Sequence, residues 1–152
     1  MTSWSKEFEV RWADLDPNFH LRHSVYYDFG AAMRVDMLSE FGITPAFMRQ
    51  HQLGPIILRE ECVFLKEISS GDRVSVDVHL LKARRDYSRW TFVHHIFKND
   101  TVISAKLTID GAWLNTEIRK LTVPPIEVLE TFKSIPTAED FAWDEKTSKS
   151  QQ

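Results

Sequence analysis

The fold is decided by residues 14–27, Asp-Leu-Asp-Pro-Asn-Phe-His-Leu-Arg-His-Ser-Val-Tyr-Tyr, where a strand pattern stops and a helix pattern starts. Two carboxylates, an amide and two imidazoles fall within ten residues of this segment. We expect a strand-to-helix junction that brings these side chains to the N-terminus of a helix. Free backbone N–H groups and the helix dipole favour negative charge there, which suits a reaction that develops an oxyanion.

The residues just before this segment predict a strand. Residues 8–12 alternate between apolar and charged side chains, so Phe8, Val10 and Trp12 would share one face. This period of two is typical of a half-buried strand, and Pro17 would break it.

Residues 24–41 predict one long helix after the segment. Ser24 or His23 stands where an N-cap is expected, and Gly42 and Pro45 favour the end of the helix. Gly30 lies in mid-helix, where glycine costs about 1 kcal/mol relative to alanine. We expect a close approach of the helix to a sheet to offset that cost. The apolar stripe of this helix consists of Tyr26, Phe29, Met33 and Met37.

The rest of the chain predicts four long strands and a short helix. The strand patterns cover residues 56–68, 73–82, 87–98 and 101–114, and Gly111 is the expected position of a β-bulge. Pro124 and Pro125 open a short helix that reaches about Phe132. Because one helix cannot cover both faces of five strands, we expect an α+β layout in which an antiparallel sheet curls around one nearly buried helix. The open sheet edges favour dimerisation.

Composition indicates one soluble domain. We expect a single domain over residues 1–145 and a polar, mobile C-terminal tail over residues 146–152. The net charge of -3 argues against general nucleic-acid binding. One cysteine excludes an internal disulfide, and neither a signal peptide nor a membrane-spanning run is apparent. A cytoplasmic location is the expectation.

The order of these elements resembles that of the hot-dog-fold thioesterases, of the 4-hydroxybenzoyl-CoA thioesterase and plant acyl-ACP thioesterase kinds, over most of residues 5–125. Asp14-Leu15-Asp16-Pro17 looks like the Asp-x-Asp signature of the bacterial enzymes, whose second Asp, here Asp16, is catalytic. Asp16, Asn18 and His20 look like the Asp-x-Asn-x-His run of the plant-type enzymes, which continues with a second Asn where this chain has His23. Arg59-Glu60-Glu61-Cys62 is similar to a segment that supplies an acidic catalytic residue, and the match falls on Glu61.

The resemblance implies a hot-dog fold, with a five-stranded antiparallel sheet wrapped around one long central helix, and hydrolysis of an acyl-CoA or acyl-ACP thioester without a metal or cofactor. Asp16 would attack the thioester or draw a proton from water, and the sequence does not choose between these roles. The plainer interpretation is that Asp16 bonds its own backbone, as Asp-Pro often does.

The neighbouring loop residues have roles beside this carboxylate. His20 would orient Asp16, donate to the thiolate or hold water, unless it is a surface histidine. Asn18 would bond the substrate carbonyl or water, unless it is a turn residue. The backbone N–H of His23 would point at the oxyanion. Asp14 is expected to be structural, paired with Arg11 or Arg22.

Other candidates lie outside the loop. Glu61 would come from a second strand of the same or a partner subunit, or would simply pair with Arg59 or Lys66. Cys62 is expected to be a small buried hydrophobe, and Cys/His catalysis with His20 is a minor alternative.

Residues on other elements would contact the substrate. Arg84, Arg85 and Arg89 would bind CoA phosphates, or form a solvated hairpin tip. Tyr26 and Phe29 are expected to contact the substrate, in an apolar tunnel lined by Phe29, Met33 and Phe64.

The remaining histidines do not predict a metal site. His79, His94 and His95 lie on strands, and consecutive histidines point to opposite faces. Two function classes remain, a thioester hydrolase acting as a homodimer or dimer of dimers (a homotetramer), and a non-catalytic acyl-CoA- or lipid-binding module of the same fold. A hydratase on this fold is less favoured.

Overall fold

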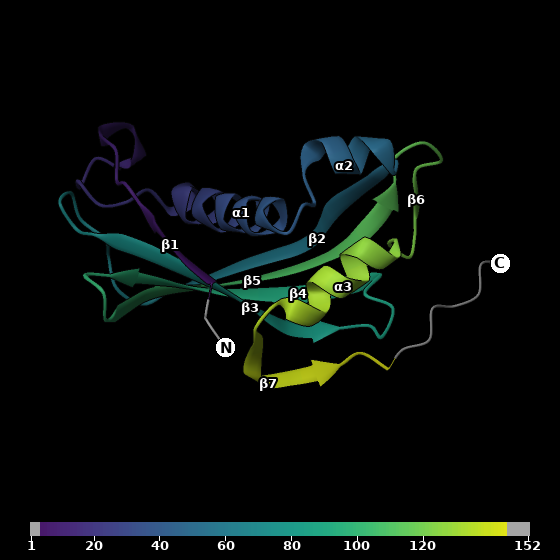
Figure 1. The fold of residues 1–152 in the computed structure, drawn as a ribbon. Coiled ribbons are helices and arrows are strands. Elements are labelled where there is room, and N and C mark those ends of the chain that lie inside the picture. Colours follow the sequence, from purple (N-terminus) through teal and green to yellow (C-terminus); the bar gives the residue numbers. More distant parts are fainter. Residues whose placement is uncertain (1–3, 146–152) are drawn as a thin grey trace.

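The computed structural model describes residues 4–145 as one curled sheet with three helices (Figure 1). The elements in chain order are β1 (Trp4–Phe8), the short 3-10 helix η1 (Trp12–Asp14), α1 (His23–Glu40), α2 (Pro45–Gln50), β2 (Leu53–Phe64), β3 (Val74–Ala83), β4 (Arg89–Lys98), β5 (Val102–Asn115), β6 (Lys120–Leu121), α3 (Ile126–Ser134) and β7 (Thr137–Trp143). The expected tail, residues 146–152, lies outside the described residues.

The sheet has seven strands rather than the predicted five. Its main path follows the order β1-β3-β4-β5-β2, and every pair along this path is antiparallel. The two additional strands fill edges that the main path leaves open. β6 pairs with the end of β5, and β7 pairs in parallel with the second half of β3, beyond the segment that β1 covers.

Helices α1 and α3 lie on the same face of the sheet. Alternate residues of β4 share this face: the ring of Phe92 lies 5.7 Å from Phe132 of α3, and His94 contacts Arg34 of α1. The predicted helix is present within one residue at each end, but only eight of its 18 residues are buried. The expectation of one nearly buried central helix is therefore not confirmed, because α1 shares the inner face with α3 and keeps an exposed outer side.

Gly30 lets α1 approach the sheet closely, as the sequence predicts. A Cβ atom at this position would lie 3.1 Å from Leu107 Cδ1 and 3.4 Å from His94 Cδ2. The 3.1 Å distance is tighter than usual for carbon atoms, so a side chain here would require Leu107 to shift or the helix to move outward.

A buried polar pair lies in the same contact. The Arg34 guanidinium donates to Nε2 of the fully buried His94 at 2.9 Å, so this ring must carry its proton on Nδ1, which lies 2.7 Å from the Asp77 carbonyl oxygen. Burial, and then the charge of Arg34, lower the pKa of His94 to about 3. Burial also lowers the pKa of Arg34 to about 10, against the opposing effect of Glu60, which leaves the guanidinium charged at neutral pH.

The first strand was predicted in the wrong place. β1 ends at Phe8, and Trp12, expected on a buried face, begins η1 and is 80% exposed. The backbone turns there because the Asp14 carboxylate accepts hydrogen bonds from the Arg11 backbone N–H and from its guanidinium. This local contact overrides the alternating pattern of residues 8–12.

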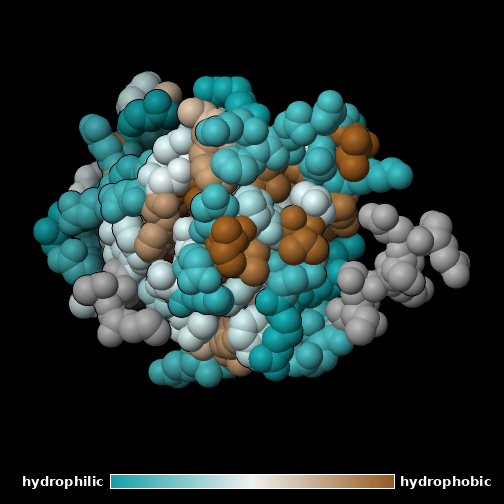
Figure 2. Space-filling view, turned by 45° about the vertical axis from the view of Figure 1, so that its right-hand side comes forward, coloured by the Kyte–Doolittle hydropathy of each residue, from teal (hydrophilic) through white to brown (hydrophobic). Residues whose placement is uncertain are grey.

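The surface at the α3 and β6 end is mixed. Figure 2, which brings the right-hand side of Figure 1 forward, shows apolar residues set among hydrophilic ones. Exposed apolar side chains near this end are Ile118, Leu121, Val123 and Ile126. Among the described residues no helix has both the length and the apolar character needed to cross a bilayer.

The bulge predicted at Gly111 is found in its partner strand. The β2–β5 register shifts between Ile57 and Arg59, opposite Gly111 and Asp110. Gly111 itself is required by the ring of Trp90, whose atoms would lie 2.1–2.5 Å from a Cβ at this position.

Replacement of Gly111 by alanine is expected to lower the free energy of unfolding by about 1–3 kcal/mol, because the buried Trp90 ring has to move. Urea unfolding measures this change. Gly54→Ala is the matched control, since its Cβ would meet only a Thr116 methyl group at 3.2 Å. Equal losses in the two variants would contradict the assigned role of Trp90.

His94 is expected to make stability pH-dependent. Its pKa is lowered in the folded state, so below about pH 6.5 the unfolded chain takes up a proton that the folded protein does not. Stability is therefore lost as the pH falls, by up to about 1.4 kcal/mol per pH unit. Urea unfolding from about pH 7.5 to about pH 4.5 should give a shallower slope for His94→Gln than for the wild type. The exposed-residue variant His51→Gln should retain the wild-type slope, and an unchanged slope in His94→Gln would refute the assignment.

Candidate active site

The loop before α1 is held by the segment that joins β2 to β3. The Leu21 backbone N–H donates to the Ile68 carbonyl at 2.7 Å, and His20 forms an isolated bridge with Ser69. A second bridge joins Leu15 to Leu21 across the loop. These backbone contacts fix the segment that carries the predicted catalytic residues.

Asp14 has the predicted structural role. Its carboxylate is buried and accepts a hydrogen bond from the Arg11 guanidinium at 2.9 Å. This hydrogen bond holds the pKa of Asp14 below its usual value, although burial acts in the other direction. The Arg22 side chain ties the same turn by donating to the Ala13 carbonyl at 2.8 Å. Asp14 therefore anchors the loop and is not available to a substrate.

The Asp16 carboxylate has one oxygen bound within the loop. Its Oδ1 atom accepts the backbone N–H of Asn18 at 2.9 Å and that of His20 at 3.1 Å. The plainer interpretation, that Asp16 bonds its own backbone, is thus observed. Within residues 4–145, Oδ2 makes no hydrogen bond, so the carboxylate is fixed in direction by one oxygen and keeps the other available.

Helix α1 begins at His23 without a capping side chain. Its N-cap is Arg22 rather than the expected Ser24 or His23, and the Arg22 side chain bonds the Ser24 hydroxyl instead of a backbone amide. The first backbone N–H groups of an uncapped helix have no intrahelical acceptor and carry partial positive charge. They are suitable donors to an anion beside Asp16.

An open cavity of about 370 Å³ brings several predicted residues together. Asp16, His20, His23 and Tyr26 line one side of it, and residues 64–67 line the other. Asn18 is exposed and contributes only its amide to Asp16, which matches the turn interpretation of this residue.

The apolar residues are divided between the cavity and the core. Tyr26 and Phe64 meet edge to face, with ring centroids 5.0 Å apart, and both line the cavity. Phe29 instead stacks on Phe8 at 4.9 Å within the core, and Met33 is fully buried. Phe29 and Met33 therefore do not line this cavity within one chain.

Two charged residues of this cavity were not singled out from the sequence as site residues. Lys66 and Glu67 follow the end of β2, where the predicted strand ran on to residue 68. A backbone hydrogen bond and the charges of His20 and Lys98 lower the pKa of Glu67. Two charged residues at the end of a strand, beside the loop, could have identified this pair. The prediction that the strand runs to residue 68 placed both residues inside the strand and hid this signal.

Glu61 does not line this cavity within one chain. Its carboxylate pairs with Arg59 at 2.7 Å on the exposed edge strand, one of the alternatives that the sequence left open. Cys62 is partly buried, and burial raises its pKa to about 11. A thiol of this kind is a poor nucleophile at neutral pH, which weighs against Cys/His catalysis.

The three predicted phosphate-binding arginines lie at the opposite end of β3. Arg85 pairs with Glu145 at 2.8 Å and stacks on Trp143, and Arg84 lies 3.6 Å from Asp144. Arg89 lines a separate cavity with Lys82 and Asp110. Because β3 has ten residues, about 30 Å separates this hairpin from the Asp16 loop in one chain.

A family model of the thioesterase-like superfamily matches residues 10–132 of the chain. The protein belongs to this superfamily. Its membership confirms the resemblance to the hot-dog-fold thioesterases that the loop motif and the order of elements indicated. In sequence, no curated protein is significantly similar to this member of the superfamily.

Solved structures share the fold of this superfamily member. A Staphylococcus aureus protein solved in complex with CoA is 18% identical, with a TM-score of 0.79 over 95% of this chain and 90% of the other. The DHNA-CoA thioesterase of Staphylococcus aureus is 18% identical, with a TM-score of 0.78 over 88% and 90%. The 1,4-dihydroxy-2-naphthoyl-CoA thioesterase of Synechocystis is 13% identical, with a TM-score of 0.77 over 88% and 97%. At these identities the likeness concerns the fold alone.

Proposed function

We propose that the protein hydrolyses an acyl-CoA or acyl-ACP thioester to a free acid and a thiol, with Asp16 as the key carboxylate. The observation that carries this proposal is the position of Asp16, whose loop fixes one oxygen while the other is available beside the uncapped start of α1. Superfamily membership supports the reaction class, and the CoA thioesterases of like fold support a CoA ester as substrate.

Asp16 acts by one of two routes in this proposal. As a base, it takes a proton from water while the water oxygen bonds to the carbonyl carbon, and the proton passes to the thiolate as the C–S bond breaks. As a nucleophile, its free oxygen bonds to that carbon and displaces the thiolate, and water then cleaves the anhydride. In both routes negative charge develops on the carbonyl oxygen, where the first amides of α1 would donate.

His20 and Asn18 support the carboxylate in this scheme. The backbone N–H groups of both residues hold Asp16, so their contribution begins with its orientation. The imidazole of His20 also lines the cavity, where it can hold water or donate a proton to the thiolate. Tyr26 and Phe64 supply the apolar wall for the acyl group.

We further propose that the working unit contains two copies joined along β2. This strand is the end of the main path, and its exposed apolar residues are Ile57, Leu58, Val63 and Phe64. A long apolar edge strand of this kind favours pairing with another chain. In this proposal the second copy runs antiparallel along β2, with its Glu61 at the Asp16 cavity of the first.

The alternative function is a non-catalytic acyl-CoA- or lipid-binding module. It is favoured by one observation, that Asp16 closes its own loop and would be needed for structure without any reaction. Acyl-CoA binding by calorimetry in the absence of turnover would support this alternative.

Asp16→Asn is expected to reduce kcat at least about 100-fold, because the amide can neither accept a proton nor attack while its oxygen still bonds the loop amides. The measurement is thiol release from a panel of aliphatic and aromatic acyl-CoA esters. Asp28→Asn, on the exposed side of α1, is the matched control and should retain full activity. Equal rates in wild type and Asp16→Asn, or no ester cleaved by either, would contradict the proposal.

A mixed dimer tests whether Glu61 acts across the interface. Asp16→Asn and Glu61→Gln are each expected to be inactive, whereas co-expression of the two chains should restore about one quarter of the wild-type sites in a statistical two-fold dimer. Such a heterodimer holds one site with both changes and one with neither. If the mixture is no more active than the separate variants, while Glu61→Gln alone is inactive, the two residues do not meet across an interface.

A further inference from the structure

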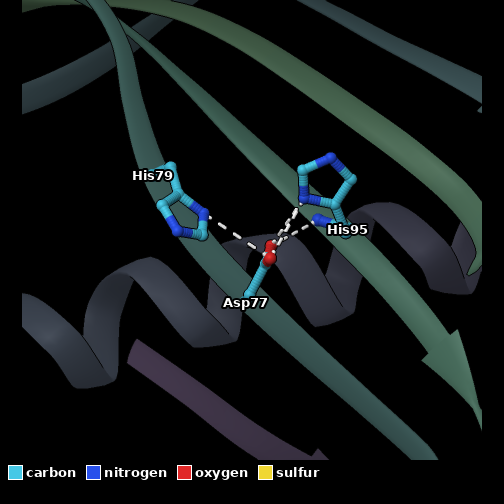
Figure 3. Close-up of side chains that lie close together, drawn as sticks. All are labelled: Asp77, His79 and His95. Atoms are coloured by element: carbon cyan, nitrogen blue, oxygen red, sulfur yellow. Dashed lines mark hydrogen bonds and ion pairs between the residues drawn. The ribbon is translucent and has the colours of Figure 1, made fainter. Parts of the chain in front are cut away.

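A second cluster of titratable side chains lies on the outer face of the sheet, away from α1. Asp77 and His79 are two residues apart on β3 and share a face, and His95 extends from the neighbouring strand β4 toward them (Figure 3). The adjacent His94 points to the inner face, where it meets Arg34. The cluster is therefore separate from the Asp16 cavity.

The three side chains converge on one point. Nδ1 of His95 lies 3.0 Å from Asp77 Oδ2, and Nδ1 of His79 lies 3.5 Å from the same oxygen (Figure 3). One nitrogen or oxygen from each residue lies within 4.8 Å of the others. In a tetrahedral site with metal–ligand bonds of about 2.0–2.1 Å, neighbouring ligand atoms are about 3.3 Å apart. The observed separations from the carboxylate agree with that spacing.

The His79 ring contacts the other two members of the cluster. Its Nδ1 atom is buried and makes no hydrogen bond to any of residues 4–145, while it faces the Asp77 carboxylate. A buried nitrogen that makes no hydrogen bond and lies 3.5 Å from a carboxylate calls for an explanation such as an absent ion. His95, by contrast, is oriented by Asp77, which also accepts its backbone N–H at 2.5 Å.

The surroundings favour a cation. The cluster lines a cavity of about 340 Å³ together with Glu139 and Asp140 of β7, which add two carboxylates to that of Asp77. Lys106 of β5 lines the same cavity and is the opposing positive charge. Its side chain is exposed and long enough to turn toward solvent. Since only these three residues bring ligand atoms together among residues 4–145, water would supply a fourth ligand.

We propose that Asp77, His79 and His95 form a binding site for a first-row divalent transition-metal ion such as Zn²⁺. Two imidazoles and one carboxylate are the donor set that such ions prefer over Mg²⁺ or Ca²⁺, which select oxygen ligands. The ion joins β3 to β4. It lies on the face opposite α1 and takes no part in thioester cleavage.

The test is metal binding by the full-length, untagged protein. Calorimetry with Zn²⁺ should give one site per chain, Co²⁺ should give the visible absorption of a tetrahedral complex, and Zn²⁺ should raise Tm by several degrees. His79→Gln should weaken Zn²⁺ binding at least about tenfold, as should His95→Gln. Because the His79 ring loses only its 3.5 Å contact with Asp77 and its ring contact with His95, His79→Gln should change the metal-free Tm much less than it changes the rise in Tm that Zn²⁺ causes.

Two histidines outside the cluster serve as controls. His20→Gln, in the Asp16 loop, and His51→Gln, after α2, should bind Zn²⁺ as the wild type does. No binding by the wild type, or full binding retained in His79→Gln, would overturn the proposal. Loss of binding in His20→Gln with retention in His79→Gln would move the ion to the Asp16 loop and equally reject the cluster.

Discussion

The rest of the structure depends on the contact between α1 and the sheet at Gly30. Because this residue has no side chain, the helix backbone comes close to Leu107 and His94, and Arg34 then reaches His94 one turn later. This close packing fixes the depth and direction of the helix. Its first turn is thereby held at the end of the sheet where residues 14–22 enter, and the bond from Leu21 to Ile68 fastens the loop to the sheet connection. The geometry around Asp16 is a consequence of how the helix packs.

Hydrophobic periodicity predicted the helices and strands that bury one face. It failed where a specific contact, local or distant in sequence, determines the backbone conformation. The long helix and the four long strands alternate or repeat as their buried faces require, so their positions could be predicted to within a few residues. The first strand could not, because the Arg11–Asp14 contact turns the chain before Trp12. β7 was missed because Glu139 and Asp140 interrupt its pattern and its partner strand is far away in sequence.

The same distinction holds for the candidate site. Asp16, His20 and His23 could be found from sequence since one short loop carries them all, and no long-range register is needed to bring them together. Phe29 shows the limit, because an apolar stripe on a helix does not say which members face the core and which a cavity. The outer cluster needed the register of β3 and β4, which sequence alone does not give, whereas the opposite facing of His94 and the next residue could be predicted and is observed.

The parallel pairing of β7 with β3 has a consequence for synthesis on the ribosome. Within residues 4–145 the edge of β3 at Ala83 is covered by Trp143 and Asp144, so about 60 further residues must be translated before that edge can close. At a usual elongation rate this interval is about 3–12 s. During it the β3–β4–β5 meander can already pair with itself while half of one edge strand stays open to other nascent chains. β7 therefore covers this edge late, and the edge of β3 is exposed while residues 84–143 are being translated.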